Sequence, residues 1–178
     1  MARIESVSAT KRKLREFQIL KSSLAIRNYG LIDDDTDHIY IKFDGPTDSA
    51  YTGGQYILYI KLNEKWPFDA PVVQLLTPSG RFSPATPICI NGITHYHGDT
   101  YSPKLTLESL VIGFMSMMLE NIEGVAHISS SDDEKRKLAR LSVKWNTDWE
   151  KNNGITWMKP TSNTAGCTSC GGCTSCSV

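Results

Sequence analysis

The chain has 178 residues, which suits a single domain, and 40% of them are hydrophobic, enough to bury a sizeable core. Its 19 basic and 19 acidic residues give a formal net charge of zero. No overall field therefore draws the protein toward nucleic acid, and a charged partner must be met by a local patch.

A helix is expected first, with Ser8 or Thr10 as its N-cap. Apolar side chains recur at near-helical spacing among basic residues, which predicts one apolar and one basic face. The apolar positions are Leu14, Phe17, Leu20 and Leu24. This N-terminal stretch has no apolar run of signal-peptide length, and no segment reaches the roughly 18 uninterrupted apolar residues of a membrane span. We therefore expect a cytoplasmic or nuclear protein.

Four short strands are expected next. Residues 38–43 alternate strictly between apolar and polar side chains, and residues 55–62 place their apolar side chains on one side, as half-buried strands do. A turn rich in Gly, Pro and Asp separates the two. Further strands are expected around residues 25–32 and over residues 72–76. Consecutive short strands favour an antiparallel meander.

Regular periodicity stops over residues 77–104, a segment rich in proline and glycine that contains Cys89. Long irregular segments in compact domains are more often functional than accidental. Helical spacing returns over residues 105–120 and again after Ser131 and Asp132, which suit an N-cap. The last helix would carry Leu138, Leu141, Trp145 and Trp149 as its apolar side chains. This order of elements is typical of an α+β fold with helices segregated from an antiparallel sheet.

Residues 159–178 have almost no apolar side chain besides cysteine, so we expect a disordered tail after a folded unit of residues 1–158. The tail cysteines recur at every third position: Cys167, Cys170, Cys173 and Cys176. They could bind zinc or another thiophilic metal, although structural zinc sites usually separate two CxxC pairs by about 12 residues or more. They could instead be S-acylated and attach the protein to a membrane, or stay unmodified.

Four local sequences resemble the ubiquitin-conjugating enzyme (E2) family. Residues 45–56, GPTDSAYTGGQY, are similar to the family's turn before its third strand, and residues 65–71, KWPFDAP, to its aromatic-Pro-Phe-x-x-Pro element. Cys89 stands between two isoleucines, where the family has its active-site cysteine, and residues 101–118 resemble the start of its second long helix. The resemblance covers roughly residues 8–150. It implies the ubiquitin-conjugating (UBC) fold: an N-terminal helix, a four-stranded antiparallel meander, a long active-site loop and C-terminal helices.

Within the family, the chain looks most like the class anchored in the endoplasmic-reticulum membrane by its C-terminus. The similar segments are TPSGRF (77–82), HGDTYSP (97–103) and EKRKLARLSVKWN (134–146). Three features depart from that class: Ser79 replaces an asparagine, Tyr101 replaces a tryptophan, and the cysteine tail stands in place of a membrane anchor. We therefore expect no transmembrane segment, and membrane attachment only if the tail is acylated.

The resemblance implies an acyl relay. Cys89 would accept ubiquitin, or a ubiquitin-like protein, as a thioester from an activating enzyme (E1). It would then pass the acyl group to a lysine, or to a hydroxyl acceptor, with the help of a ligase (E3). In a reducing compartment Cys89, the only cysteine before Cys167, would be a thiol. No cofactor and no metal in the domain are implied, since ATP is used by the E1.

Other site residues are placed by their distance from the cysteine. Ser79 and Arg81 stand where ordinary family members have the His and Asn of a His-Pro-Asn tripeptide. Arg81 is therefore the first candidate for stabilising the oxyanion, and Ser79 for holding the loop through its hydroxyl. Asp99 and His97, with His95 as the weaker alternative, could assist removal of a proton from the acceptor.

The same resemblance implies two partner surfaces. A RING-type ligase would meet two loops that border the sheet and the second helix, at Leu62, Trp66, Pro103 and Lys104. The acidic domain of the E1 would meet the basic face of the first helix, at Lys11, Arg12 and Arg15.

Plainer interpretations stay open. Cys89 alone would more often be a packed small hydrophobe, and its loop and the family motifs are what favour catalysis. His95 and His97 could be solvated loop histidines, and Asp99 could cap a turn. Two other functions are an E2-like scaffold that binds ubiquitin without catalysis and an adaptor that acts through a metal-binding or lipidated tail. Such scaffolds generally lack the cysteine that this chain has.

Overall fold

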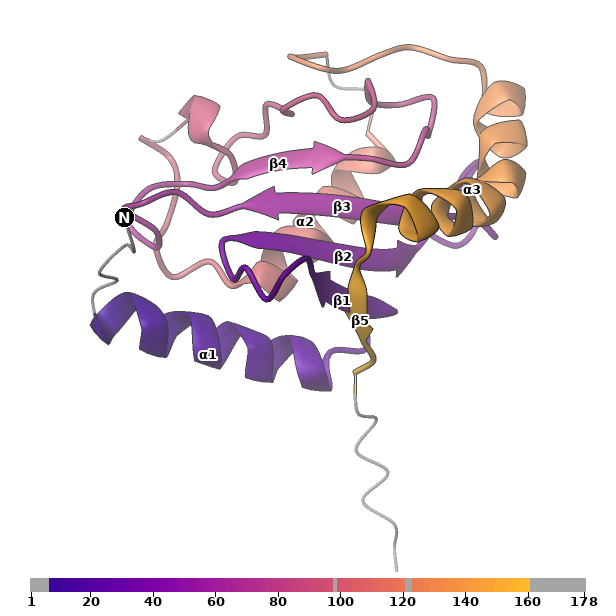
Figure 1. Cartoon of the computed structure of the whole chain (residues 1–178). Helices are drawn as coiled ribbons and strands as arrows, with labels where there is room; N and C mark the ends of the chain where they lie inside the picture. The colour runs from indigo at the N-terminus through magenta and orange to yellow at the C-terminus, as the bar shows by residue number, and fades with distance from the viewer. Residues whose placement is uncertain (1–6, 98, 121–122, 161–178) are drawn as a thin grey trace, which may run out of the picture.

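The computed structural model describes residues 7–97, 99–120 and 123–160 (Figure 1). Its elements, in chain order, are α1 (Val7–Ser22), β1 (Asn28–Leu31), β2 (His38–Asp44), β3 (Gln55–Lys61), β4 (Val72–Leu75), the short 3-10 helix η1 (His95–His97), α2 (Leu107–Met118), α3 (Asp132–Asn153) and β5 (Thr156–Met158). Figure 1 shows the sheet in the middle, with α1 along one side, α2 behind it and α3 at one end. The predicted α+β class is confirmed.

The strands form one antiparallel sheet in the order β4-β3-β2-β1-β5. The first four are the predicted meander. Strand β5 was not predicted: the chain returns after α3 and pairs with β1, with Trp157 opposite Gly30. A Cβ on Gly30 would lie 2.9 Å from the carbonyl oxygen of Thr156 and from the Trp157 ring, so the close approach of β5 requires glycine there.

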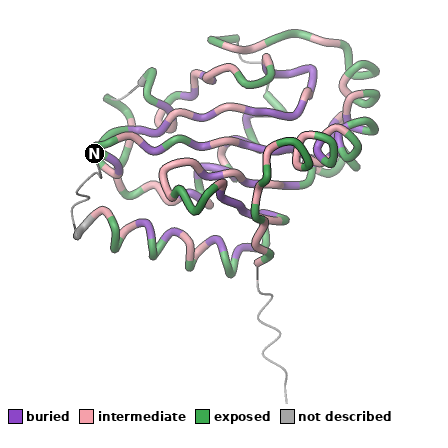
Figure 2. The backbone as a smooth tube through the Cα atoms, in the orientation of Figure 1, coloured by how far each residue is buried: buried purple, intermediate pink, exposed green. Residues whose placement is uncertain are grey.

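One face of the sheet and α2 enclose the core. The alternation in β2 buries Ile39, Ile41 and Phe43 completely. Phe114 of α2 packs edge-on against Phe43, with ring centroids 6.0 Å apart. Figure 2 shows that buried positions concentrate on the central strands and the chain packed against them. Burying each such side chain contributes about 1.5–3 kcal/mol, which is why the strand alternation predicts the core well.

The opposite face of the sheet is partly covered by the last turns of α3 and by the Trp157 side chain of β5. The ring centroid of Trp149 in α3 lies 5.5 Å from that of Tyr40 in β2. Lys42 forms an ion pair with Glu150, and its Nζ lies 4.6 Å from the centroid of the Trp157 ring in β5. These contacts hold the end of α3 and β5 against the outer side of β2.

Helix α1 contributes only part of the apolar stripe that its sequence predicts: Leu20 is fully buried, and Phe17 packs against the core with its ring centroid 6.0 Å from that of Tyr29. The helix begins at Val7, so Ser8 and Thr10 lie inside it rather than at its cap. Leu14 is 59% exposed and Leu24 is 94% exposed. From residue 9 to the end of this helix, the buried positions are Lys13, Glu16 and Leu20.

A buried carboxylate explains how α1 is held. Glu16 is 1% exposed; it accepts hydrogen bonds from the Leu107 N–H at 2.7 Å and from Arg12 Nε at 2.6 Å. Arg12 also donates to the carbonyl oxygen of Leu105 at 2.8 Å. Leu107 is the first residue of α2, whose N–H has no acceptor within its own helix. The carboxylate therefore joins the start of α2 to α1, a tie that hydrophobic periodicity cannot reveal.

Helix α3 also docks through polar side chains. Its predicted cap is confirmed, because the Ser131 hydroxyl accepts the Glu134 N–H at 3.2 Å. Its predicted apolar stripe is wrong at Leu141, which is 52% exposed. The buried residues of this helix are Ala139, Ser142 and Asn146.

Asn146 and Ser142 complete the hydrogen bonding at the start of β3. Ser142 Oγ accepts the Gln55 N–H at 2.8 Å, and Asn146 Nδ2 donates to the Gln55 carbonyl oxygen at 2.9 Å. The Thr77 hydroxyl donates to Asn146 Oδ1 at 2.6 Å and accepts the Ile57 N–H at 2.9 Å. Because buried polar groups need partners, this network sets where the irregular segment starts relative to the sheet and α3.

Replacing Asn146 by alanine leaves the Thr77 hydroxyl and the Gln55 carbonyl without these partners. We expect Asn146→Ala to lower the free energy of unfolding by about 2–3 kcal/mol, measured by urea denaturation. Asn152, exposed on the same helix, supplies the control: Asn152→Ala should stay within about 0.5 kcal/mol of the unmodified chain. Equal unfolding midpoints for the two variants would contradict this account of α3.

Candidate active site

The chain around Cys89 is held by backbone hydrogen bonds on two sides. The Ile88 N–H donates to Val73 of β4 at 2.9 Å, and the Cys89 N–H donates to Val125 at 3.4 Å. Ile88 is 0% exposed and Ile90 is 5% exposed, whereas Cys89 between them is only half-buried. Burial of both neighbours leaves Cys89 as the side chain of this stretch that reaches the surface.

Cys89 lines an open groove of about 380 Å³. The walls come from the loop after Cys89, from α2 and from the segment after α2: Ile90, Asn91, Ile93, Gly113, Met117, Glu120, Glu123, Gly124 and His127. A Cβ on Gly113 would lie 3.1 Å from Ile93 Cδ1, so the missing side chain lets this loop pack against α2. Cys89 thus lies on a groove that is open to solvent.

A tight turn follows the cysteine. The Thr94 N–H donates to the Ile90 carbonyl oxygen at 3.0 Å, and Thr94 Oγ1 accepts the Ile90 N–H at 2.8 Å. Gly92 has a φ of +72°, a left-handed conformation that favours glycine. The Gly92 N–H donates to Thr100 Oγ1 at 3.0 Å, and the Thr100 hydroxyl donates to Asn91 Oδ1 at 2.6 Å. These bonds close the loop beside the groove.

Ser79 and Arg81 lie on the segment before the cysteine. Ser79 is fully buried, and its hydroxyl oxygen accepts the N–H groups of Arg81 at 3.2 Å and Phe82 at 3.4 Å. Arg81 is 5% exposed, donates from Nε to the Glu120 carbonyl oxygen at 3.1 Å and lies 5.0 Å from the Phe82 ring centroid. Burial lowers the pKa of the Arg81 guanidinium. The role predicted for Ser79 stays a prediction, and these are the bonds through which it would act.

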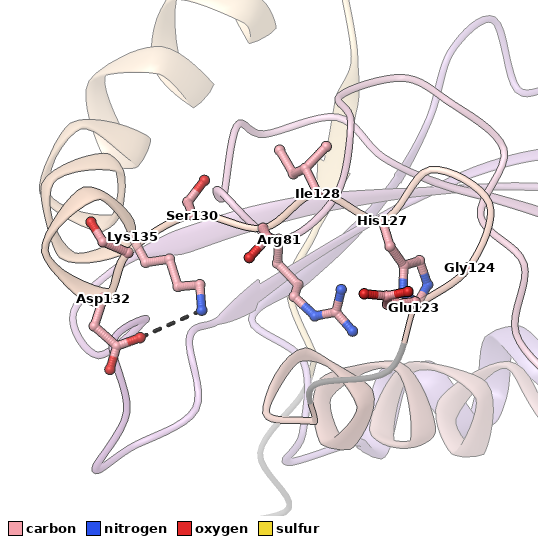
Figure 3. Close-up of a pocket in the computed structure, with 10 residues that line it drawn as sticks. Arg81, Glu123, Gly124, His127, Ile128, Ser130, Asp132 and Lys135 are labelled. Carbon is pink, nitrogen blue, oxygen red and sulfur yellow. Dashed lines mark hydrogen bonds and ion pairs between the residues drawn. The ribbon is translucent and has the colours of Figure 1, made fainter.

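Arg81 belongs to a second pocket, of about 700 Å³, at the start of α3. This pocket shares Glu123, Gly124 and His127 with the Cys89 groove. Figure 3 shows the Arg81 guanidinium directed toward Glu123 and His127. Arg81 is not among the described residues that line the Cys89 groove, so its predicted action on the oxyanion stays a prediction.

The candidate bases lie on the loop beyond the groove. His95 and Asp99 are exposed, and neither is among the described residues that line the groove. The His95 ring centroid lies 4.2 Å from that of Tyr96, and the backbone amide N–H of His95 donates to the Pro71 carbonyl oxygen at 3.3 Å. His97 ends η1, and its side chain lies outside the described part of the structure. A role for these residues in proton removal stays a prediction.

Several groove residues were not predicted from the sequence. Glu120, Glu123 and His127 come from the segment after α2, which carries no recognisable motif. Asn91 adjoins the cysteine, and its only sequence signal is the Asn-Gly pair, which marks a turn rather than a site. Folding brings these side chains to Cys89.

The predicted ligase surface is exposed only in part. Leu62 is 2% exposed and Trp66 is 4% exposed, Pro103 is half-buried, and Lys104 is exposed. Phe68, on the same loop as Trp66, is 73% exposed and is the aromatic side chain of that loop that meets solvent.

On the predicted E1 surface, Lys11 and Arg15 are exposed. Arg12 is half-buried, and its guanidinium carbon lies 5.7 Å from the Trp66 ring centroid. Arg12 also donates hydrogen bonds to Glu16 and to the Leu105 carbonyl oxygen, so its guanidinium helps to hold α1 against the start of α2.

Within the described residues, no group of three or more His, Cys, Asp or Glu side chains could hold a metal ion. The tail cysteines Cys167, Cys170, Cys173 and Cys176 lie outside the described residues, as does most of the predicted tail. None of the helices in the described part of the chain has the length and hydropathy of a membrane span.

A helix, an antiparallel meander, an irregular segment with a half-exposed cysteine and C-terminal helices together define the UBC class of fold. The family model described as "Ubiquitin-conjugating enzyme" matches residues 11–137, and the chain belongs to the ubiquitin-conjugating enzyme family.

Known relatives point to one part of this family. The chain is 34% identical to "Ubiquitin-conjugating enzyme E2 6" of Saccharomyces cerevisiae over 103 residues, 58% of this chain and 41% of that protein. It is 34% identical to "Ubiquitin-conjugating enzyme E2 J2" of Homo sapiens over 102 residues, 57% of this chain and 39% of that protein. A Kluyveromyces lactis "Ubiquitin-conjugating enzyme E2 6" is 27% identical over 143 residues, 80% of this chain and 57% of that protein. The matches thus span about 40–60% of the length of these relatives.

Removing the Ser79 hydroxyl deprives two backbone N–H groups of their acceptor in a buried setting. We expect Ser79→Ala to lower the free energy of unfolding by about 1–2 kcal/mol, measured by urea denaturation. Ser116→Ala, on the exposed side of α2, should change it by less than about 0.5 kcal/mol. A Ser79 variant as stable as the Ser116 variant would show that this hydroxyl does not hold the segment.

Proposed function

We propose that this chain is an active E2 enzyme that carries ubiquitin, or a ubiquitin-like protein, on Cys89. The observation that carries the proposal is a half-exposed cysteine on an open groove, within a domain of the ubiquitin-conjugating enzyme family. A non-catalytic scaffold would have no need of an accessible thiol at this position.

The reaction consists of two acyl transfers. The Cys89 thiolate attacks the carbonyl carbon of the E1 thioester; a bond to Cys89 Sγ forms, and the E1 cysteine leaves as thiolate. An amine or hydroxyl acceptor then attacks the same carbonyl carbon, loses a proton, and expels Cys89 as thiolate. Both steps exchange an already activated ester, so the E2 itself needs no cofactor. A cytosolic or nuclear setting suits the reaction, because a reducing compartment keeps the thiol available.

The surrounding residues divide the work. Ser79 holds the segment before the cysteine through its two backbone hydrogen bonds. Arg81 contributes positive charge from the adjoining pocket. Asp99 and His97 accept the acceptor's proton when the loop beyond the groove approaches the bound substrate.

Partner proteins meet the edge formed by α1, α2 and the loops between them. An E1 binds the exposed Lys11 and Arg15, with Arg12 keeping α1 in position. A RING-type ligase binds the neighbouring loops at Pro103 and Lys104, with the exposed Phe68 ring as an apolar contact and Leu62 and Trp66 supporting it from beneath.

Charging tests the proposal directly. Incubated with E1, ATP and ubiquitin, the full chain should form an adduct on a non-reducing gel that disappears on reduction. Cys89→Ala should abolish the adduct although it retains the four tail cysteines, and Cys89→Ser should give an ester that resists thiols. An adduct that persists in Cys89→Ala would place the acyl group elsewhere. No adduct with ubiquitin or ubiquitin-like proteins would reject the enzyme in favour of a scaffold.

Proton removal is tested by discharge. The double variant His97→Ala, Asp99→Ala should charge nearly as well as the unmodified chain but discharge to free lysine or serine about 100-fold more slowly. Asp148→Ala, exposed on α3, is the control for loss of a carboxylate. Equal discharge rates would remove both loop residues from the mechanism.

A further inference from the structure

The Cys89 groove must accommodate the negative charge that develops on the carbonyl oxygen during acyl transfer, which requires a hydrogen-bond donor. Among the described residues that line it, the glutamates accept hydrogen bonds when ionised, and the isoleucines and methionine have no strong donor. The lining side chains that can donate to an oxyanion are those of Asn91 and His127.

The His127 ring is packed within one wall of the groove. It lies edge-on to Phe82, with ring centroids 5.1 Å apart, and its Nε2 is buried. A Cβ placed on Gly124 would lie 3.5 Å from that nitrogen. The ring therefore lies against the backbone of its own turn, in which the backbone amide N–H of His127 donates to the Gly124 carbonyl oxygen at 3.1 Å.

Asn91 is placed differently. It follows Cys89 by two positions, it is exposed, and its amide is oriented by a neighbour. Thr100 Oγ1 accepts the Gly92 N–H at 3.0 Å and donates its own hydrogen to Asn91 Oδ1 at 2.6 Å. Because the Asn91 oxygen accepts this bond, the orientation of the amide is fixed and its Nδ2 group is left as a donor on a residue that lines the groove.

We propose that Asn91 is a catalytic residue that donates from Nδ2 to the oxyanion, and that Thr100 is the residue that positions it. This proposal rests on the proposed acyl-transfer function. When the acceptor attacks the thioester carbonyl carbon, the carbonyl π electrons move to oxygen, and the Nδ2–H stabilises that charge. The acceptor's proton passes to Asp99 or His97, as in the proposed function; as the intermediate collapses, the carbonyl re-forms, the bond to Cys89 Sγ breaks and Cys89 leaves as thiolate. Asn91 exchanges no proton at any point.

The test is single-turnover discharge of the full chain, charged with ubiquitin and separated from E1, into increasing concentrations of free lysine. Asn91→Ala and Asn91→Asp both remove the donor, and the aspartate keeps an acceptor for Thr100. Both should lower the maximal discharge rate about 100-fold. This is the smaller end of the effect usual for losing an oxyanion donor, because solvent reaches this exposed site. The KM for lysine should change little, since the donor acts on the transition state. Asn152→Ala and Asn152→Asp on α3 are the matched controls.

Thr100 is tested by two variants. Thr100→Val keeps the shape of the side chain but loses the hydroxyl, and should lower the maximal rate in the same direction as the Asn91 variants. Thr100→Ser restores the hydroxyl and should recover most of the rate. Urea denaturation of each variant separates a change in folding from a change in rate. A valine variant that discharges at the unmodified rate would overturn the positioning role.

The outcomes separate this proposal from the proposed function. An unmodified chain that does not charge rejects the function itself. A chain that charges normally and discharges within twofold of the unmodified rate in both Asn91 variants overturns the donor role. Slow discharge in the aspartate variant alone would indicate charge repulsion and would also overturn it. If the Asn91 variants shift the pH dependence of discharge but reach the unmodified rate at its plateau, Asn91 takes part in proton transfer, and the donor role is overturned.

Discussion

The position of Cys89 depends on backbone hydrogen bonds that hold an irregular segment on both of its sides. On one side Ile88 bonds to Val73 of β4. On the other, the Ser83 N–H donates to Ala126 at 2.7 Å, and the Ile128 N–H donates to the Arg81 carbonyl oxygen at 3.0 Å. The segment after α2 thus exchanges backbone hydrogen bonds with the segment before and at Cys89, although it is not a strand of the sheet. These bonds satisfy backbone groups of the irregular segment that carries the thiol.

Both long flanking helices are held by buried polar groups. Glu16 joins α1 to the start of α2, and Asn146 joins α3 to β3 and to Thr77. Such groups are costly when unpaired, so each contact has a narrow geometry. These polar contacts also adjoin the proposed functional surfaces. Arg12 lies between the proposed E1 and ligase surfaces. Thr77 begins the irregular segment that leads to Cys89.

Prediction from sequence succeeded where burial follows a simple period. The meander and α2 were predicted because Ile39, Ile41 and Phe43 alternate and because Phe114 belongs to a helical stripe. It failed at Leu14 and Leu141, whose helices use charged or hydrogen-bonding residues at their buried positions. Strand β5 was missed because three residues are too few to show the alternation of a strand. Its formation depends on pairing with the edge of β1 that β2 leaves open.

The sequence by itself determined the fold class and the family, and it singled out the cysteine for which we propose the acyl transfer, because these features reside in local periods and short motifs. Only the tertiary structure decided which side chains face that cysteine. It placed Arg81 in the neighbouring pocket, brought His127 into the groove wall and turned the Asn91 amide through Thr100. The physical reason is that these relations are hydrogen bonds and packing contacts across an irregular loop. Which residues form these contacts depends on how segments far apart in the sequence pack together, and the spacing of residues along the chain does not predict that packing.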